Sequence, residues 1–388
     1  MNFCPRRKER QENKMKNRVA ELLAKNNIDA ILISNDVNNL YVTGEIFGGY
    51  TYITAQGEII LFSKYADKVG EFETVKIRKP EQIPELLGKK PQTLSLDDES
   101  SSAADWIRLS NAFSFCNIVT RKNIMRTARI VKTPSELEKI KKAAEQQMTV
   151  YSKIPELFEE GMTDTDLAIK LEGALRKCGH NGIFRTHGFH MECFMGSLLC
   201  GQNGEEASVY DFALGGKGAT KALPIGACGD AIKAGDAVMV DYSGCYDGYL
   251  CDMTRTFFVK EIAPKALYAH NVSIEIQELV QPMLKEGVCA FEIWEKTLEI
   301  VKKHSLEGCF MGLSKQSKFV GHGVGLEINE PPVMCTNDKT PLEQNTVLAI
   351  EPKFVIKGIG AVGVEDTYTV EKNSGILLTD FERKAIII

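Results

Sequence analysis

The sequence lacks any apolar run that could cross a membrane. Its longest runs, such as AVMV at 237–240 and AIII at 385–388, hold four residues each, whereas a transmembrane helix needs ~20. The first eighteen residues are basic and polar, and no apolar stretch follows their charges as it would in a secretory signal peptide. We therefore expect no membrane partner and a cytoplasmic location.

An excess of positive charge is also absent. The chain has 47 Lys and Arg residues against 52 Asp and Glu residues, which gives a net charge of −5. Proteins that bind phosphate backbones generally depend on a basic surface. We therefore expect no nucleic-acid partner.

The 11 cysteines include no CxxC pair. A disulfide framework is typical of short secreted chains with an even cysteine count, and neither condition holds here. We expect free thiols in a reducing compartment. Five cysteines fall between positions 193 and 251, so a zinc or redox site there remains the alternative.

The composition is that of a globular protein of two or three domains. The chain has 388 residues, of which 44% are hydrophobic and 26% are charged. Its first third alternates between the two periodicities: strands at 30–33, 51–54, 59–62 and 113–119 interleave with a helix at 102–109. We predict a smaller α/β domain over 1–130 and a second domain over 131–388.

Two capping boxes open the second domain. Thr133, Pro134 and Glu136 form the first, and Thr163 with Asp166 forms the second. From about 185 onward, strands and glycine loops dominate, apart from two helical stretches near 264–285 and 291–304.

Four carboxylates and one histidine stand out among these later strands. Asp241 and Asp252 flank a stretch with turn residues, so a hairpin can bring both to one point. His322 lies between two glycines, which let the backbone pack closely around it. Glu351 and Glu365 each follow an apolar run.

Taken singly, each of these residues is more typically a solvated turn residue or a structural histidine. Buried carboxylates that converge without partners are costly, and a cation is the usual reason to collect them. The joint order Asp–Asp–His–Glu–Glu, with separations of 11 (252 − 241 = 11) and 14 (365 − 351 = 14), therefore favours a metal site.

The order, the spacings and the words DGYLCDMTRTF, GHGVGLE, IEP and VEDT resemble those of the pita-bread metallopeptidase family. This family includes Xaa-Pro aminopeptidases, prolidases, methionine aminopeptidases and creatinase. Residues 131–388 resemble its catalytic domain. Residues 15–130, especially IDAILISNDVNNLYVTG, are similar to the creatinase-type N-terminal domain.

The resemblance implies an α+β fold, with a curved antiparallel sheet flanked by helices, and a dinuclear metal centre. Asp241 would hold one divalent ion, His322 and Glu351 the other, and Asp252 and Glu365 would bridge both. Oxygen-rich ligation with a single imidazole suits Mn, Co, Fe or Zn. Glu351 would also move the proton of the attacking water. The implied activity is cleavage of short peptides next to proline, in a homodimer.

Three positions depart from the family pattern. Ile225 and Asn329 stand where members usually carry histidines that contact the substrate, and Gly363 stands where proline-specific members often carry an arginine. Isoleucine cannot donate a hydrogen bond, and asparagine can donate one but cannot titrate. Asn329 is therefore a weaker candidate catalytic residue.

The segment FRTHGFHMECFMG at 184–196 offers replacements for the missing groups. His187 or His190 could contact the substrate, and Arg185 could bind a carboxylate or a tetrahedral anion. Ordinary structural histidines remain the alternative. Two other functions also remain open: a hydrolase of small molecules with carbon–nitrogen bonds, as creatinase is, and a metal-binding pseudo-peptidase.

Overall fold

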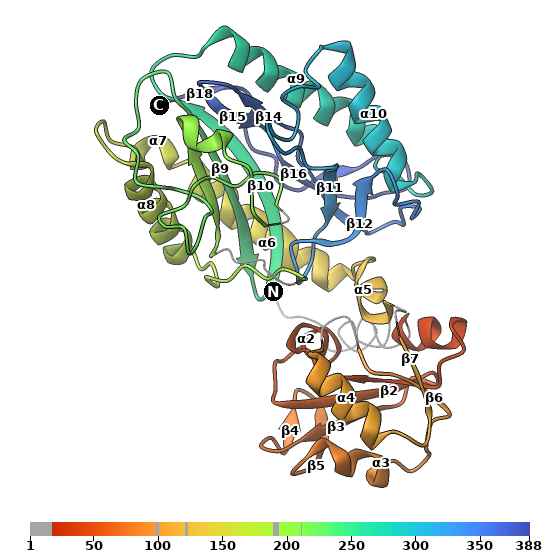
Figure 1. Ribbon diagram of the computed structural model, residues 1–388. Coiled ribbons are helices and arrows are strands. Elements are labelled where there is room, and N and C mark those ends of the chain that lie inside the picture. The colour runs from red at the N-terminus through yellow and green to blue at the C-terminus, as the bar shows by residue number, and fades with distance from the viewer. Residues whose placement is uncertain (1–17, 98–100, 121–122, 189–193, 211) are drawn as a thin grey trace. The chain divides into compact units, whose positions relative to one another are not determined.

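The computed structural model describes residues 18–97, 101–120, 123–188, 194–210 and 212–388. The chain divides into two compact units, Met1–Arg129 and Ile130–Ile388 (Figure 1). No described helix has the length and apolar character needed to span a membrane. The nine cysteines that the structure describes are all free thiols, as the sequence predicts.

A seven-stranded mixed sheet forms the first unit, in the order β4-β5-β3-β2-β1-β6-β7. The interior strand β1 pairs antiparallel with β2 and parallel with β6. Its apolar side chains are fully buried because helices cover the sheet. The strands are β1 (Ala30–Ile33), β2 (Gly49–Thr54), β3 (Ile59–Ser63), β4 (Lys68–Val69), β5 (Phe72–Lys76), β6 (Thr93–Ser95) and β7 (Asn117–Val119).

One predicted strand of this unit is partly replaced by the end of a helix. Helix α4 (Ala103–Ala112) begins where Ser102 caps it, as expected. The predicted strand over 113–119 is wrong in its first half, because the Phe113 N–H bonds to Leu109 O and ends the helix. The remaining short elements are a helical stretch at residues 18–25, α2 (Asp36–Thr43), η1 (Pro80–Gln82), α3 (Ile83–Leu86) and α5 (Ile124–Arg129).

Both predicted capping boxes are present in the second unit. The Thr133 hydroxyl accepts a hydrogen bond from the Glu136 N–H, and the Glu136 carboxylate accepts one from the Thr133 N–H. Thr163 and Asp166 repeat this exchange. The helices are α6 (Pro134–Tyr151), α7 (Ile154–Leu157), α8 (Asp164–Lys177), α9 (Pro264–Val280) and α10 (Ala290–Lys303), with 3₁₀ turns η2 (Gly201–Glu205) and η3 (Gln281–Met283).

Three sheets of mainly antiparallel strands make up the rest of this unit. A four-stranded sheet has the order β18-β10-β9-β8, a five-stranded sheet has the order β12-β11-β13-β16-β17, and β14 pairs with β15. The strands are β8 (Gly196–Cys200), β9 (Ala237–Tyr246), β10 (Tyr249–Phe258), β11 (Phe319–Gly323), β12 (Glu330–Cys335), β13 (Val347–Ile350), β14 (Lys353–Ile356), β15 (Gly360–Gly363), β16 (Asp366–Thr369), β17 (Ile376–Leu377) and β18 (Ile386–Ile387).

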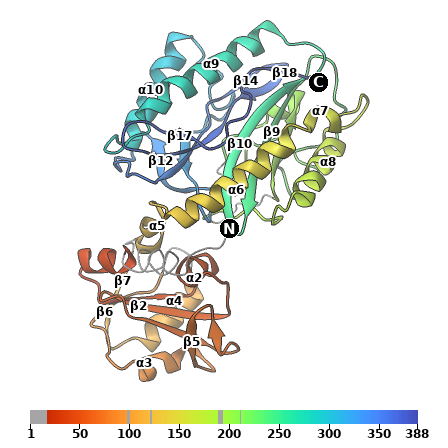
Figure 2. The ribbon, with the colours of Figure 1, turned by 180° about the vertical axis from the view of Figure 1, so that it is seen from behind.

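Helices cover these sheets from two directions. Helix α6 runs along β9 and β10 (Figure 2), whereas α9 packs on β14 and β15, and α10 packs on β12. Each helix layer buries its own apolar cluster against the strands. The strands between the two layers are therefore buried on both sides, and the predicted metal ligands lie on these strands or directly beside their ends.

Candidate metal centre

A tight hairpin brings Asp241 and Asp252 to the same face of their sheet. Strands β9 and β10 pair Asp252 with Ser243 and Asp241 with Thr254, so the two carboxylates are diagonal neighbours. The connecting turn is Asp247-Gly248, whose φ angles of 50° and 80° are both positive. Such a turn matches the twist of the flanking strands.

His322 is placed by strand β11, which pairs with β12 and β13. A Cβ at Gly321 would collide with the Ala349 carbonyl, and one at Gly323 with the Pro331 carbonyl. The two glycines therefore allow the close packing around the imidazole that the sequence predicts.

Glu351 and Glu365 lie directly beside the ends of two further strands. Glu351 follows β13, and its N–H bonds to Val320 O at 2.8 Å. Glu365 precedes β16 and exchanges two backbone hydrogen bonds with Thr254, of 3.1 and 3.3 Å. These bonds join the β16 segment to the hairpin that carries the aspartates.

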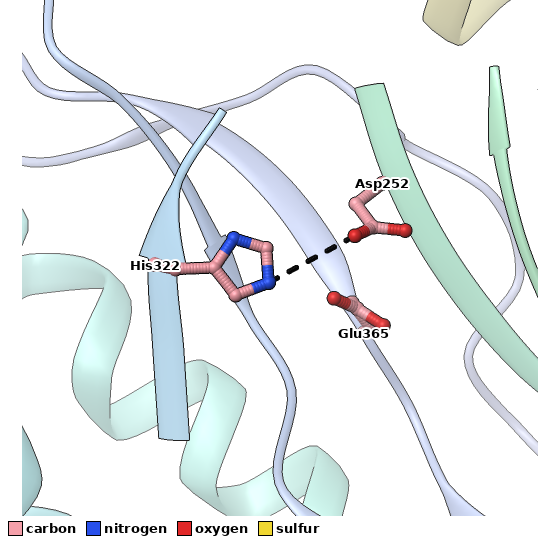
Figure 3. Close-up of side chains that lie close together, drawn as sticks. All are labelled: Asp252, His322 and Glu365. Carbon is pink, nitrogen blue, oxygen red and sulfur yellow. Dashed lines mark ion pairs between the residues drawn. The ribbon is translucent and has the colours of Figure 1, made fainter. Parts of the chain in front are cut away.

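Asp252, His322 and Glu365 point toward one another (Figure 3). Each offers one ligand atom, these atoms lie within 4.8 Å of one another, and all three side chains are buried. His322 Nε2 lies 3.9 Å from Asp252 Oδ2 and 3.3 Å from Glu351 Oε1. Glu365 Oε1 is buried and has no hydrogen-bond partner among the described residues. An unpartnered buried oxygen in this setting fits a bound cation.

Lys353 is the residue that the sequence analysis missed. Its Nζ donates to Asp241 Oδ2 at 2.8 Å, to Glu351 Oε2 at 2.8 Å and to Glu365 Oε2 at 2.9 Å. Its side chain is 1% exposed. One signal was available: residues two apart on an extended chain face the same way, so Lys353 had to accompany Glu351.

Gly363 faces Lys353 across the β14–β15 ladder. A Cβ at this position would lie 2.6 Å from Pro352 O, 3.0 Å from Lys353 Cα and 3.4 Å from Lys353 Cγ. The arginine often found here in proline-specific members therefore has no room beside this lysine.

The charges in the cluster perturb one another strongly. Burial alone would lower the pKa of Lys353, but the carboxylates around it hold that pKa well above its usual range. Burial alone would raise the pKa of Glu351, but Lys353 and His322 outweigh it and lower the pKa to about 2. Burial and neighbouring carboxylates raise the pKa of Glu365 to about 7, against the effect of Lys353. Burial, Glu365 and Asp241 raise the pKa of Asp252 well above its usual range.

Asn329 uses its amide on the backbone of His187. Its Nδ2 donates to His187 O at 2.8 Å, and its Oδ1 accepts from the His187 N–H at 2.7 Å. The His187 ring lies on the side of Glu327, with 3.8 Å between Nδ1 and Oε1. The structure therefore brings Asn329 and His187 to each other. His190 lies outside the described residues.

Arg185 and Ile225 show no contact with the acidic cluster among the described residues. The Arg185 Nη1 atom is buried without a hydrogen-bond partner in the described part of the chain. Ile225 is half-buried in a loop, and its N–H bonds to Leu223 O. The expected contact of Arg185 with a carboxylate or a tetrahedral anion stays a prediction.

The four described cysteines of the cysteine-rich stretch are free thiols, and Cys193 lies outside the described residues. Burial raises the pKa of Cys228 and Cys245 to about 11, and it raises the pKa of Cys200 and Cys251 further. These thiols are protonated at neutral pH, whereas metal ligation and nucleophilic attack need the thiolate.

Residues 138–372 match the model of metallopeptidase family M24. The chain belongs to this family. Residues 16–131 match the creatinase/prolidase N-terminal domain. The α+β pita-bread fold with a creatinase-type N-terminal domain, predicted from the sequence motifs, is thereby confirmed.

Relatives of this M24 chain match it along almost its whole length. It is 28% identical over 379 residues to the Xaa-Pro dipeptidase of Pyrococcus horikoshii, covering 96% of this chain and 99% of the relative. It is 29% identical over 384 residues to the Xaa-Pro dipeptidase of Pyrococcus furiosus, covering 96% and 100%. The solved prolidase of Pyrococcus horikoshii superposes with a TM-score of 0.79 at 26% identity, covering 96% and 100%.

Proposed function

We propose that this M24 chain is a metal-dependent hydrolase of short peptides with an Xaa-Pro bond. One observation carries the proposal: buried Asp252, His322 and Glu365 converge within 4.8 Å, and Glu365 Oε1 has no hydrogen-bond partner among the described residues. The names of the full-length relatives support the substrate class, since both Pyrococcus relatives are Xaa-Pro dipeptidases.

A divalent ion held by these residues would polarise the scissile carbonyl and acidify the attacking water. The two ions that the family resemblance implies, and the choice among Mn, Co, Zn and Fe, stay predictions.

Side chains of this protein would transfer the proton and orient a ligand in the proposed reaction. Lys353 and His322 favour the carboxylate form of Glu351 by lowering its pKa. Its Oε2 is hydrogen-bonded to Lys353, so Oε1 is the atom that would take the proton of the water and pass it to the leaving amine. The Thr254 hydroxyl donates to Glu365 Oε2 at 2.7 Å and fixes the orientation of that carboxylate.

The test is turnover of a panel of Xaa-Pro dipeptides and tripeptides with added Mn²⁺. His322→Gln should abolish turnover and metal retention together, because it removes the only imidazole of the proposed ligand set. His304→Gln is the matched control, since His304 pairs with Glu275 on the helical side of the unit and should behave as the wild type. A folded, metal-loaded wild type that cleaves none of these peptides would contradict the proposal.

A small-molecule carbon–nitrogen hydrolase on the same fold is the second candidate function. It is favoured by Asn329, whose amide is committed to the His187 backbone in place of a substrate-binding histidine. Release of amine or urea from small amides or guanidino compounds, in place of peptide cleavage, would support it. Metal binding without turnover of either class would support a pseudo-peptidase.

We also infer a homodimer, from the resemblance to the proline-specific branch, and a reducing cytoplasmic compartment, from the free thiols of the nine described cysteines. Light scattering on the eluting protein tests the first point. A molar mass of one chain at working concentrations would contradict it.

A further inference from the structure

The ammonium of Lys353 lies among the carboxylates that a second metal ion would need. We propose that it takes the place of one of the two divalent ions implied by the family resemblance, so that the centre binds a single ion at Asp252, His322 and Glu365. This inference rests on the proposed metal dependence and specifies it further.

The hydrogen-bond geometry of Lys353 is saturated. An ammonium has three N–H donors, and Nζ directs them at one oxygen each of Asp241, Glu351 and Glu365, at 2.8 to 2.9 Å. Divalent ions contact carboxylate oxygens at roughly 2.0–2.2 Å. An ion bound to these same three oxygens would therefore overlap the lysine nitrogen.

The carboxylates of Glu351 and Glu365 are split between two environments. In each, Oε2 accepts from Lys353. Glu351 Oε1 lies 3.3 Å from His322 Nε2, and Glu365 Oε1 has no partner among the described residues. In both carboxylates, Oε2 therefore faces Lys353 and Oε1 is left on the His322 side, where an ion can bind. The family resemblance implies that Asp241 binds the ion whose place Lys353 takes. In this structure Asp241 accepts a hydrogen bond from Lys353 instead.

The surroundings hold Lys353 in this position. It begins strand β14, where it pairs with Gly363 of β15, and its side chain is 1% exposed. Gly363 is the residue that leaves room for its backbone and stem. A dication at the Asp241 position would also lie against the ammonium, where two like charges a few ångströms apart in a buried site repel strongly.

The experiment counts metal ions in the folded full-length protein. Wild type is stripped with chelator, reloaded with excess Mn²⁺, freed of unbound ion, and analysed for Mn per chain and by electron paramagnetic resonance. We expect about one ion per wild-type chain, with the spectrum of an isolated Mn²⁺. Lys353→Gly should raise the count to about two and give a spectrum of coupled ions, because it frees Asp241, Glu351 and Glu365 together.

Lys357→Gly is the matched control, because Lys357 is exposed on the same β14–β15 hairpin, and its count should equal that of the wild type. Lys353→Ala repeats the test if the glycine variant does not fold, and the wild-type count decides even if neither folds. About two coupled ions in wild type would overturn the inference and leave the proposed function standing. A folded Lys353 variant that still binds only one ion would also overturn it. A folded wild type that retains no ion would overturn both.

Discussion

At the scale of single residues, Lys353 neutralises part of the negative charge of the acidic cluster. Four carboxylates bring a formal charge of −4 to the cluster, and three of them contact the one ammonium. In the metal-free protein, this ammonium offsets their repulsion, together with His322 beside Glu351. Its contribution to folding should therefore be largest when no metal is bound.

Replacing Lys353 by Met should destabilise the metal-free protein by about 3–5 kcal/mol, because it leaves buried carboxylates without their cation. Urea unfolding in the presence of chelator measures this, and Lys357→Met serves as the control for the loss of a lysine. Equal unfolding midpoints for the two variants would mean that the Lys353 contacts contribute nothing to stability.

Asn329 and Ile225 are expected to limit turnover. A donor to the developing oxyanion is typically worth ~10²–10³ in turnover, and these two positions lack the histidines of the family pattern. The double variant Ile225→His, Asn329→His should therefore cleave Xaa-Pro peptides faster than Ile225→Ala, Asn329→Ala, which breaks the same contacts with His187 without supplying a donor.

Equal rates for the two double variants, both folded and metal-loaded, would show that these positions do not limit the reaction. If wild type is instead fully active and loses its activity on His187→Ala, the histidine function has moved to that residue.

The sequence predicts that acidic residues and His322 come together, but it does not predict that a lysine lies among them. Asp241, Asp252, His322, Glu351 and Glu365 follow a recognisable order, and the strands that carry them are apolar and regular. Lys353 is not part of the residue pattern that predicts these five positions. The structure shows that its side chain points inward, because it is 1% exposed and its Nζ bonds to three of the carboxylates. The assignment of the five residues as ligands stays a prediction.

At the scale of secondary-structure elements, local signals account for most of what was predicted. The Thr133 and Thr163 capping boxes fix the starts of α6 and α8, because each satisfies backbone N–H groups that have no partner within the helix. The predicted strand over 113–119 is present only at Asn117–Val119, because Phe113 is an apolar, fully buried residue that ends a helix. Burial alone does not distinguish an apolar residue at the end of a helix from one on a strand.

The β9–β10 hairpin should depend on its turn. Gly248→Ala should destabilise the protein by about 1–2 kcal/mol, because Gly248 has a φ of 80° that alanine adopts only with strain. Gly308→Ala is the control, since no heavy atom lies within 4 Å of its added Cβ and its φ is not positive. Thermal unfolding of both variants measures the difference, and equal melting temperatures would contradict the argument.

At the scale of the whole molecule, metal binding should be linked to folding of the M24 unit. The candidate ligands come from β10, β11 and the segment before β16, which meet only when the sheets are assembled. The unfolded chain has no such site, so an ion that binds the folded state stabilises it by about 2.7 kcal/mol at a concentration of 100 times its Kd.

Chelator should therefore lower the melting temperature of the wild type, and Mn²⁺ or Co²⁺ should restore it. Calorimetry with and without the metal measures the shift. The His322→Gln variant should melt at one temperature under both conditions. A wild-type curve that does not respond to chelator would contradict the convergence of these residues on an ion.

The most direct measurement is turnover of an Xaa-Pro dipeptide by metal-free wild type as Mn²⁺ is added in fractions of one equivalent per chain. Our account predicts that the rate rises in proportion to the added ion and becomes constant at about one equivalent, because Lys353 occupies the other position. A rate that keeps rising to about two equivalents would contradict the role given to Lys353. A folded protein that binds the ion and cleaves no dipeptide at any ratio would contradict the peptidase function itself.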